Sequence, residues 1–388
     1  MTPVSLNSDE LSKELVAPDE VGERVIIYQE VDESGVATGR SATFADIEFR
    51  GLGYADLIGH TLGTPLVMPL RLANARVVES NLLDLSLETQ ETQVSVSAVL
   101  DSPYSSRALG LVRDGWLPSG IAFSDSMIVL PDRCVFSELA GRFRAGEKTK
   151  LEDKDFLDFL IGHKVRINPL LYMLEGNLKR NPDDASIEHQ FEVATKIINA
   201  ALPLAQIVPN GRDGLEGIRG LIRDSEAGMA RKQEFLTRLA PKLRAPIAAR
   251  RVNEVWDEVL ATAKACEVPV RSLVVLAALS TVCVPNGKSP AKGLLKFNVR
   301  KYTFEDAYNA LADLRSLEVL MHLFAAFPDE KILLCTGDKD LVLFWAGIRP
   351  SELAMVNGVF SAKFSLVEDL LPNVTPERKT AYFSAGDE

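Results

Sequence analysis

The spacing of hydrophobic and polar positions changes along the chain and divides it into regions. Residues 23–120 hold runs that alternate between apolar and polar positions, most clearly over residues 92–99. Glycines and the sequence Asp-Glu-Ser-Gly at residues 32–35 separate these runs. Alternation bounded by turn residues predicts β-strands. We therefore expect a small β-rich domain over residues 23–120, preceded by a polar leader at residues 1–22.

From about residue 121 the pattern changes to short apolar runs, each followed by residues with helical spacing. One run ends at Asp132, and a second ends before Pro169. A third run leads into Thr336-Gly-Asp-Lys-Asp340. Short strands that alternate with helices are typical of α/β domains. We therefore predict an α/β domain over residues 121–372 and a polar tail at residues 373–388.

Between the second and third of these runs, the spacing is helical over about a hundred residues. Helices are expected over residues 187–202, 214–239 and 246–266. The apolar run at residues 270–284 is rich in β-branched side chains, so it suits either a helix or a buried strand. Residues 183–285 are therefore predicted to form a helical elaboration of the α/β domain.

The charge of the chain is acidic, but its basic residues are unevenly distributed. The formal net charge of −11 argues against a surface that coats nucleic acid as a whole. Residues 212–251 nevertheless carry ten Lys or Arg against five Asp or Glu. A second basic group lies within residues 288–301. A local basic face that binds nucleic acid therefore stays an alternative, although a solvated helix surface would explain the first group equally well.

Features that report on the cellular compartment point to the cytoplasm. The four cysteines form no Cys-x-x-Cys pair and lie among apolar neighbours, which is typical of buried, reduced thiols. The first residues lack the basic and apolar segments of a signal peptide. The most apolar run, residues 272–284, is shorter than the roughly 18 residues needed to cross a bilayer. We therefore expect a cytoplasmic protein without membrane association.

Acidic residues stand where an α/β sheet would bring them together. Asp132 and Asp338 follow two predicted strands, and Glu175 and Asp313 lie on helices expected to pack over the same edge. Ligands of open α/β sheets bind at the carboxyl ends of the strands. Converging carboxylates are costly unless a divalent ion neutralises them, and an all-oxygen site suits Mg²⁺ or Mn²⁺. These four acids are therefore candidate metal ligands, with Asp340 as a fifth.

The order of these elements resembles that of PIN-like nuclease domains. The sequence Thr336-Gly-Asp-Lys-Asp340 is similar to the Thr-x-Asp-x-Asp element of that family. The resemblance covers about residues 124–370 and leaves the N-terminal region unassigned. It rests on the order of four acids along the chain and of the elements that carry them. Asp132 follows a predicted strand, and Glu175 lies on the helix after a second strand that ends before Pro169. Asp313 lies on a later helix, and Asp338 follows the last of these strands.

The resemblance implies a doubly wound parallel sheet and a metal-dependent nuclease that hydrolyses phosphodiester bonds, mostly in RNA. It implies that Mg²⁺ or Mn²⁺ is bound by the same catalytic acids, with Asp340 coordinating directly or through water. Thr336 and Asn309 would orient these ligands. The bound ion would activate water and stabilise an in-line displacement at phosphorus. The residues implied as ligands are Asp132, Glu175, Asp313 and Asp338.

Two alternative functions follow from the residues around the first acid. The family commonly has a hydroxyl residue or Asn after this acid, whereas this chain has Arg133 and Cys134. The guanidinium of Arg133 could replace the charge of a metal, which favours a catalytically inactive PIN-like scaffold with a regulatory or protein- or RNA-binding role. A metal-dependent phosphotransferase or phosphatase would need a second acid shortly after Asp132, which the sequence Asp-Arg-Cys lacks.

The basic residues and the N-terminal domain suggest partners. Lys and Arg side chains near the acids would guide a phosphate backbone, because phosphate contacts supply most non-specific affinity for nucleic acid. The N-terminal domain is a candidate module for binding a protein partner or substrate, with a toxin or defence system as one setting, and a homo-oligomer stays an open alternative. The candidate RNA-binding residues are Arg231, Lys232, Lys292, Lys296, Arg300 and Lys301.

Overall fold

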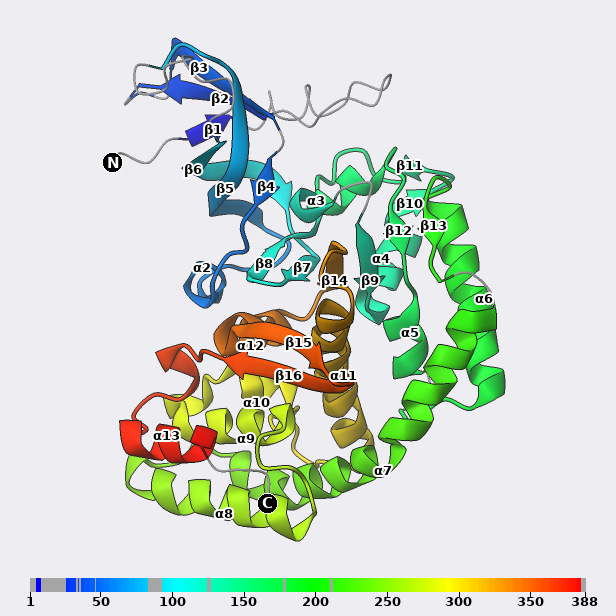
Figure 1. The fold of residues 1–388 in the computed structure, drawn as a ribbon, viewed down its shortest axis with the longest axis vertical. Coiled ribbons are helices and arrows are strands. Elements are labelled where there is room, and N and C mark those ends of the chain that lie inside the picture. Colours follow the sequence, from blue (N-terminus) through cyan, green and yellow to red (C-terminus); the bar gives the residue numbers. More distant parts are fainter. Residues whose placement is uncertain are drawn as a thin grey trace.

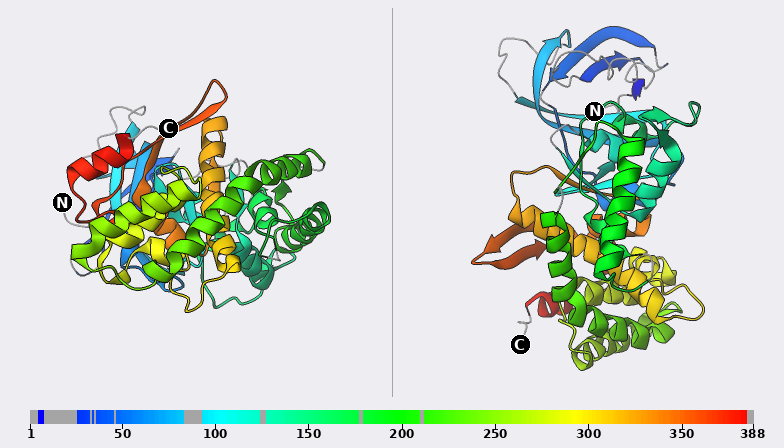
Figure 2. Two further views of the ribbon diagram at one scale, coloured as in Figure 1. Left: turned by 90° about the horizontal axis from the view of Figure 1, so that it is seen from below. Right: turned by 90° about the vertical axis from the view of Figure 1, so that its right-hand side faces the viewer.

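The computed structural model places a β-rich part, a central α/β sheet and a helical lobe in sequence along the longest axis of the molecule (Figure 1). The right-hand view of Figure 2 shows the same order. Most of the expected leader lies outside the described residues. The structure describes residues 5–7, 26–32, 34, 36–45, 47–82, 93–123, 127–176, 179–209 and 212–384.

The N-terminal part is a mainly antiparallel sheet, in agreement with the alternating pattern. Among the described residues its order is β1-β6-β5-β3-β2, with β4 on β5, and only the β1–β6 pair is parallel. Buried and exposed side chains alternate over the first half of β5, which turns one face toward the core. The strands are β1 (Ser5–Asn7), β2 (Ile26–Val31), β3 (Ala37–Ala45), β4 (Glu48–Phe49), β5 (Pro65–Ser80) and β6 (Gln93–Ser105), and helix α2 (Tyr54–Ile58) lies between β4 and β5.

A mixed sheet forms the centre of the α/β part. Its order in the described chain is β13-β12-β9-β14-β7-β8. The first four strands run parallel, whereas β7 and β8 form an antiparallel hairpin beside β14. The strands are β7 (Leu109–Val112), β8 (Gly115–Pro118), β9 (Ile128–Pro131), β12 (Arg166–Ile167), β13 (Gln206–Ile207) and β14 (Ile332–Thr336).

The α/β class is thus confirmed, but two details of the prediction are wrong. The sheet is not parallel throughout, and residues 109–118, which were predicted within the β-rich domain of residues 23–120, pair with the central sheet. The side chains of this hairpin are almost all buried and do not alternate, and the pattern along a strand does not identify the sheet that it joins. The close approach of Gly110 to Leu333 on β14 fixes this hairpin to the central sheet: a Cβ at Gly110 would lie 2.3 Å from Leu333 Cδ1.

The order of the parallel strands reverses direction between β9 and β14. From β9 the chain moves outward to β12 and β13, and it later returns to pair β14 with the other side of β9. Ile332 lies opposite Ile128, and Cys335 opposite Pro131. The residues that follow these two strands are therefore neighbours at a topological switch point, where open α/β sheets bind ligands.

Helices surround this edge and build the rest of the molecule. Helix α6 packs against α4 beside the sheet, and α7 runs from there to the helical lobe, which comprises α8, α9, α10 and α13 (Figure 1). The run at residues 270–284 is a helix, and every residue of α9 is buried. The helices are α3 (Ser119–Ala122), α4 (Arg133–Arg142), α5 (Leu170–Glu175), α6 (Asp184–Ala201), α7 (Arg212–Leu243), α8 (Val252–Ala265), α9 (Leu273–Cys283), α10 (Pro290–Leu294), α11 (Phe304–Ala326), α12 (Lys339–Ile348) and α13 (Pro376–Ser384).

The C-terminal segment that was expected to be a polar tail contains a helix. Residues 376–384 form α13, and the buried Tyr382 donates a hydrogen bond from its hydroxyl to the carbonyl of Val270 at 2.8 Å. Within the described ranges, no helix has both the length and the apolar character needed to cross a membrane. The remaining elements are the strands β10 (Phe143–Arg144), β11 (Glu147–Lys148), β15 (Pro350–Val356) and β16 (Val359–Phe364), and the 3₁₀ turns η1 (Phe156–Leu160), η2 (Ala249–Arg251), η3 (Pro285–Gly287) and η4 (Glu368–Leu370).

Candidate functional site

Asp132 is held by the turn that joins β9 to α4. Its carboxylate caps α4 by accepting a hydrogen bond from the Val135 backbone N–H at 2.8 Å. Its own backbone N–H donates to the Cys335 carbonyl on β14 at 2.9 Å. The hydroxyl of Thr336 donates to the same carboxylate. Aspartate is a favoured N-cap residue, so this acid has a structural role as well as a candidate ligand role.

Asp338 occupies the equivalent position after β14. Its Oδ1 atom caps α12 by accepting from the backbone N–H groups of Asp340 at 2.9 Å and Leu341 at 3.1 Å. Its backbone N–H donates to Thr336 Oγ1 at 2.9 Å. The fully buried Thr336 therefore bonds to both strand-end acids and fixes one relative to the other. That Thr336 orients metal ligands, as the sequence resemblance implies, stays a prediction.

Helix α11 brings the other two acids to the same edge. Arg315 on α11 donates to the Leu174 carbonyl at 2.5 Å, and the Tyr308 hydroxyl donates to the Glu175 carbonyl at 3.2 Å. These bonds satisfy carbonyls at the end of α5, which intrahelical bonds leave free. Asp313 lies between Tyr308 and Arg315 in the same helix. The contact between α11 and α5 therefore sets Glu175 beside Asp313.

Burial and mutual repulsion raise the pKa of these carboxyl groups. Burial is the largest cause for Asp313, whose pKa rises to about 8, and the charges of Asp338 and Glu175 add to it. Burial also raises the pKa of Glu175 to about 7, where the charge of Asp132 contributes. Asp132 reaches a pKa of about 6 through burial, with a further contribution from Asp338. Each acid thus interacts with at least one of the others.

A neighbouring thiol, that of Cys134, interacts electrostatically with four of these acids. Burial raises the pKa of Cys134 to about 11, and four negative charges contribute to the increase. Cys134 is also exposed at the surface, so it differs from the buried thiol expected from its apolar neighbours. Among the described cysteines, the other three are buried. The acids that act on Cys134 are Asp132, Glu175, Asp313 and Asp338.

The chain supplies cations of its own to this acid cluster, defined as Asp132, Glu175, Asp313, Asp338 and Asp340. The Lys296 ammonium lies 3.2 Å from Asp313 Oδ2 and 3.6 Å from Asp338 Oδ2. The Nε atom of Arg133 lies 3.9 Å from Glu175 Oε1, and its guanidinium lies over the Tyr172 ring. Sequence analysis missed this role of Lys296, which comes from a separate turn and carries no local signal for it.

The fifth acid, Asp340, lies at the contact between α12 and α10. Burial raises its pKa to about 6, and the charge of Asp338 contributes. A Cβ placed on Gly293 of α10 would lie only 1.9 Å from Asp340 Oδ2. Glycine at this position therefore allows α10 to pack against the carboxylate and to bring Lys296 within reach of the acid cluster.

The donor set fits a hard divalent ion in its chemistry, since it offers carboxylate oxygens and one buried hydroxyl. The side chains, however, are arranged around an ammonium. Within the part of the chain that the structure describes, no three His, Cys, Asp or Glu side chains stand in an arrangement that could hold a metal ion. A divalent ion would therefore require the oxygens of Asp313 and Asp338 that Lys296 contacts.

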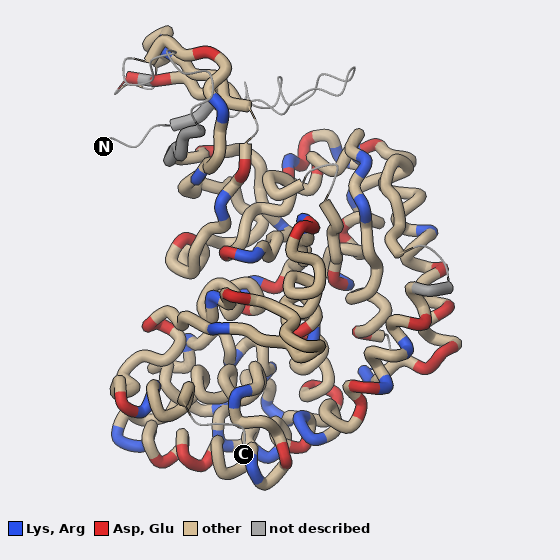
Figure 3. Tube along the Cα trace, in the orientation of Figure 1, with Lys and Arg blue, Asp and Glu red and all other residues tan. Residues whose placement is uncertain are grey.

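Two candidate residues for RNA binding are paired with acids. Arg231 lies 3.5 Å from Glu267, and Lys232 lies 2.8 Å from Glu318. Both belong to α7, along which basic and acidic residues are interspersed (Figure 3). The excess of positive charge in the sequence of α7 is thus offset by acids on neighbouring elements, as on a solvated, ion-paired helix surface.

Other candidates for RNA binding have different environments. Lys292 is buried, and its ammonium donates to the Arg244 carbonyl at 2.6 Å, so it does not face a phosphate in this structure. Arg300 and Lys301 are exposed. Asn309 lies one turn before Asp313, and within the described residues no hydrogen bond joins its side chain to the acid cluster. Arg231 is exposed as well but pairs with Glu267, whereas no ion pair is found for the side chains of Arg300 and Lys301 within the described ranges.

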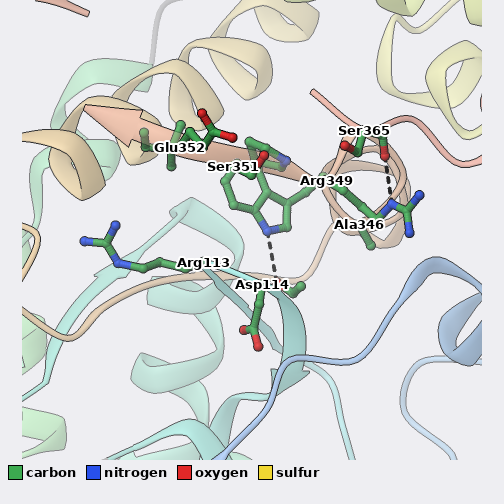
Figure 4. Close-up of a pocket in the computed structure, with 11 residues that line it drawn as sticks. Arg113, Asp114, Ala346, Arg349, Ser351, Glu352 and Ser365 are labelled. Carbon is green, nitrogen blue, oxygen red and sulfur yellow. Dashed lines mark hydrogen bonds between the residues drawn. The ribbon is translucent and has the colours of Figure 1, made fainter. Parts of the chain in front are cut away.

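A cavity of about 550 Å³ lies away from the acid cluster. It is enclosed by the turn between β7 and β8, the end of α12 and the start of β15 (Figure 4). Arg349 Nε donates to the Ser365 carbonyl at 2.7 Å, and the Trp345 indole N–H donates to the Gly115 carbonyl at 2.9 Å. These polar groups already have partners, so the cavity is a weaker candidate site than the acid cluster.

Sequence analysis located the acids because strand ends and helix periodicity are visible in a single chain. It could not locate Lys296, because the approach of α10 to α12 depends on packing between separate elements. The resulting site combines carboxylates able to bind a cation with a lysine that already neutralises two of them. Comparisons with known protein families, with curated proteins and with solved structures give no match.

Proposed function

We propose that this chain is a metal-dependent nuclease with a PIN-like domain, whose acid cluster binds Mg²⁺ or Mn²⁺ and promotes hydrolysis of phosphodiester bonds in RNA. The observation that carries the proposal is the position of Asp132 and Asp338 after two adjacent parallel strands at the switch point. Support also comes from Glu175 and Asp313, on two helices, whose charges act on Cys134 together with those of Asp132 and Asp338. The acids also occur in the order implied by the sequence resemblance.

The chemistry of such a site follows from the roles of its residues. A bound divalent ion lowers the pKa of water and stabilises negative charge at phosphorus. Asp132 and Asp338 are oriented in advance, because each caps a helix and bonds to Thr336. Without metal, Asp313 and Glu175 have pKa values of about 8 and 7, so a divalent ion that binds them near neutral pH would displace protons from their carboxyl groups.

RNA is the proposed substrate because the sequence resembles nucleases that act mostly on RNA. The exposed Arg300 and Lys301 support this choice, since they follow the turn that carries Lys296 into the acid cluster. Exposed cations next to such a site would contact phosphates that flank the reacting one. Single-stranded DNA has the same phosphate chemistry and is therefore included in the test.

The test compares the wild type with Asp338→Asn on labelled RNA and single-stranded DNA, in Mn²⁺ and in EDTA. Asparagine caps a helix as well as aspartate does, so the variant should keep its fold. Substitution of a residue that hydrogen-bonds a metal ligand typically lowers metal affinity or activity 10–100-fold. Loss of the ligand itself should therefore reduce cleavage by about 100-fold or more. The matched control is Asp224→Asn on the exposed face of α7, which should cleave like the wild type. Cleavage in EDTA, or equal cleavage by Asp338→Asn, would contradict the proposal.

A catalytically inactive scaffold is the second candidate function. The observation that favours it is the presence of Lys296 and Arg133 beside the acids, where they supply positive charge without a metal. A protein of this kind would neither cleave RNA nor bind Mn²⁺ in calorimetry. Its RNA binding, if present, would be the same in Mn²⁺ and in EDTA, because no ligand would depend on the ion.

A further inference from the structure

Lys296 is a cation of the chain that lies inside the proposed metal site. Its ammonium is within 3.2 Å of Asp313 Oδ2 and 3.6 Å of Asp338 Oδ2. Both carboxylates belong to the four assigned to the metal under the proposed function. One ammonium therefore contacts the oxygens on which a divalent ion would depend.

The backbone around Lys296 is shaped to deliver this ammonium. Lys296 follows α10 with a φ of 57°, in the left-handed region that non-glycine residues seldom adopt. Its backbone N–H donates to the Gly293 carbonyl at 2.9 Å, and the next residue, Phe297, is buried. Gly293 is also the residue at which α10 packs against Asp340. The position of Lys296 is therefore fixed by the fold, unlike that of a lysine on an open surface.

The ammonium can nevertheless withdraw without disturbing the helices that carry the acids. About a third of the surface of the Lys296 side chain is exposed to solvent, and its four-carbon stem is flexible. Asp338 uses Oδ1 to cap α12 and Oδ2 to contact Lys296. Withdrawal of Lys296 would therefore release Oδ2 while the cap stays in place. The two oxygens of Asp338 separate the structural role from the cation-binding role.

We propose that Lys296 is an internal counter-cation that competes with the divalent ion for Asp313 and Asp338, and that it sets the metal concentration at which the site loads. This inference rests on the proposed function. Two cations repel each other strongly at such distances in a partly buried site, so metal binding requires the ammonium to withdraw. In the metal-free protein the ammonium stabilises two partly buried carboxylates that would otherwise lie close together without an opposite charge.

The test uses Lys296→Met, which keeps an unbranched apolar stem and removes the charge. Mn²⁺ affinity is measured by calorimetry, and stability is measured by urea unfolding in EDTA. Typical coupling between two bound groups changes affinity 5–150-fold, so Lys296→Met should bind Mn²⁺ about tenfold more tightly than the wild type. The variant should also unfold at lower urea in EDTA, and saturating Mn²⁺ should remove this difference. Lys264→Met, at an exposed position on α8, is the matched control and should behave like the wild type.

The outcomes separate this inference from the proposed function. Equal or weaker Mn²⁺ binding by Lys296→Met would overturn the competition, and RNA cleavage by the wild type would still support the nuclease. Binding by Lys296→Met but not by the wild type would support the competition and contradict metal-dependent activity of the natural chain. Absence of binding by both proteins would contradict both statements.

A further variant covers the case in which Lys296→Met folds poorly. The double variant Lys296→Met/Asp313→Asn removes one positive and one negative charge together. If Lys296 acts as the counter-cation, the double variant should regain most of the metal-free stability lost by Lys296→Met. A double variant as unstable as Lys296→Met would show that the lysine stabilises the fold through its packing, and would overturn the inference.

Discussion

At the scale of single residues, the strand-end acids combine a structural and a candidate functional role. Asp132 and Asp338 cap the helices that follow β9 and β14, and each also contributes a carboxylate to the acid cluster. The two roles need different chemistry, because a cap needs a hydrogen-bond acceptor and a metal ligand needs a charge. Neutral substitutions that keep the acceptor can therefore separate the roles.

The first prediction compares Asp132→Asn with Asp132→Ala. Asparagine keeps the bond from Val135, whereas alanine removes it, and loss of an N-cap costs about 1 kcal/mol. Urea unfolding in EDTA should therefore show Asp132→Asn to be at least as stable as the wild type, and Asp132→Ala to be less stable than Asp132→Asn. Both variants should lose RNA cleavage in Mn²⁺. Cleavage by Asp132→Asn at the wild-type rate would show that the charge of Asp132 has no role in the reaction.

The second prediction concerns the pH dependence of stability in the absence of metal. Asp313 has a pKa of about 8 and Glu175 one of about 7 in the folded state, against about 4 for carboxyl groups in the unfolded chain. The folded state therefore holds protons that the unfolded state has lost, and stability should fall as pH rises from about 4 to about 8. Asp313→Asn should weaken this fall in urea unfolding at pH 5.5 and 8. A wild-type protein that gains stability over this range would contradict the pKa assignments.

At the scale of elements, the site depends on two helix contacts. The contact between α10 and α12 brings Lys296 to the acid cluster, and the contact between α11 and α5 sets Asp313 beside Glu175. Each contact includes one residue whose packing role can be tested by substitution. Gly293 allows the first contact, and Arg315 supports the second.

The third prediction is that Gly293→Ala disturbs the site. The new Cβ would lie 1.9 Å from Asp340 Oδ2, so α10 and α12 must move apart or Asp340 must turn away. Overpacking of this kind typically costs 1–3 kcal/mol, which urea unfolding should detect. Gly228→Ala on α7 is the matched control, because a Cβ there meets no atom within 4 Å and alanine favours a helix by about 1 kcal/mol. A stabilising effect of Gly293→Ala would contradict the close contact.

The fourth prediction is that Arg315→Met loosens the junction of α11 with α5. The buried Arg315 donates to the Leu174 carbonyl and to Asn181 Oδ1, and methionine leaves these groups without that partner. A buried polar group that loses its hydrogen-bond partner lowers the free energy of unfolding by about 1–3 kcal/mol. The exposed Arg223 on α7 provides a control, and Arg223→Met should unfold like the wild type. Equal midpoints for the two variants in urea unfolding would show that Arg315 does not hold this junction.

The strands and helices could be predicted from the sequence more accurately than the contacts between them. Asp132 and Asp338 could be placed at strand ends because an apolar run followed by an acid and a helical pattern is visible locally. The edge hairpin at residues 109–118 could not be assigned, because its partner β14 follows about two hundred residues later. Lys296 was predicted to face RNA for the same reason, since its acid partners lie on other elements. Contacts between distant segments depend on packing that periodicity does not encode.

At the scale of the whole molecule, the β-rich part is connected to the candidate site. Lys339 lies between Asp338 and Asp340 in the sequence. Its ammonium donates hydrogen bonds to the carbonyl of Ile58, the last residue of α2, and to the carbonyl of His60, two residues later. Ser105, at the end of β6, donates to the buried Asp155 at 2.7 Å, which joins the N-terminal sheet to the α/β part. The β-rich part and the acid cluster are thus linked through the first turn of α12.

The most direct test of the metal site is a titration with Mn²⁺ followed by the paramagnetic resonance signal of the free ion. The wild type should deplete this signal until its site is saturated, whereas Asp313→Asn/Asp338→Asn should leave it close to that of buffer. Asp224→Asn should match the wild type, because the same chemical change lies on an exposed helix face. Equal depletion by the wild type and the double variant, or no depletion by either, would contradict the assignment of the acid cluster as a metal site.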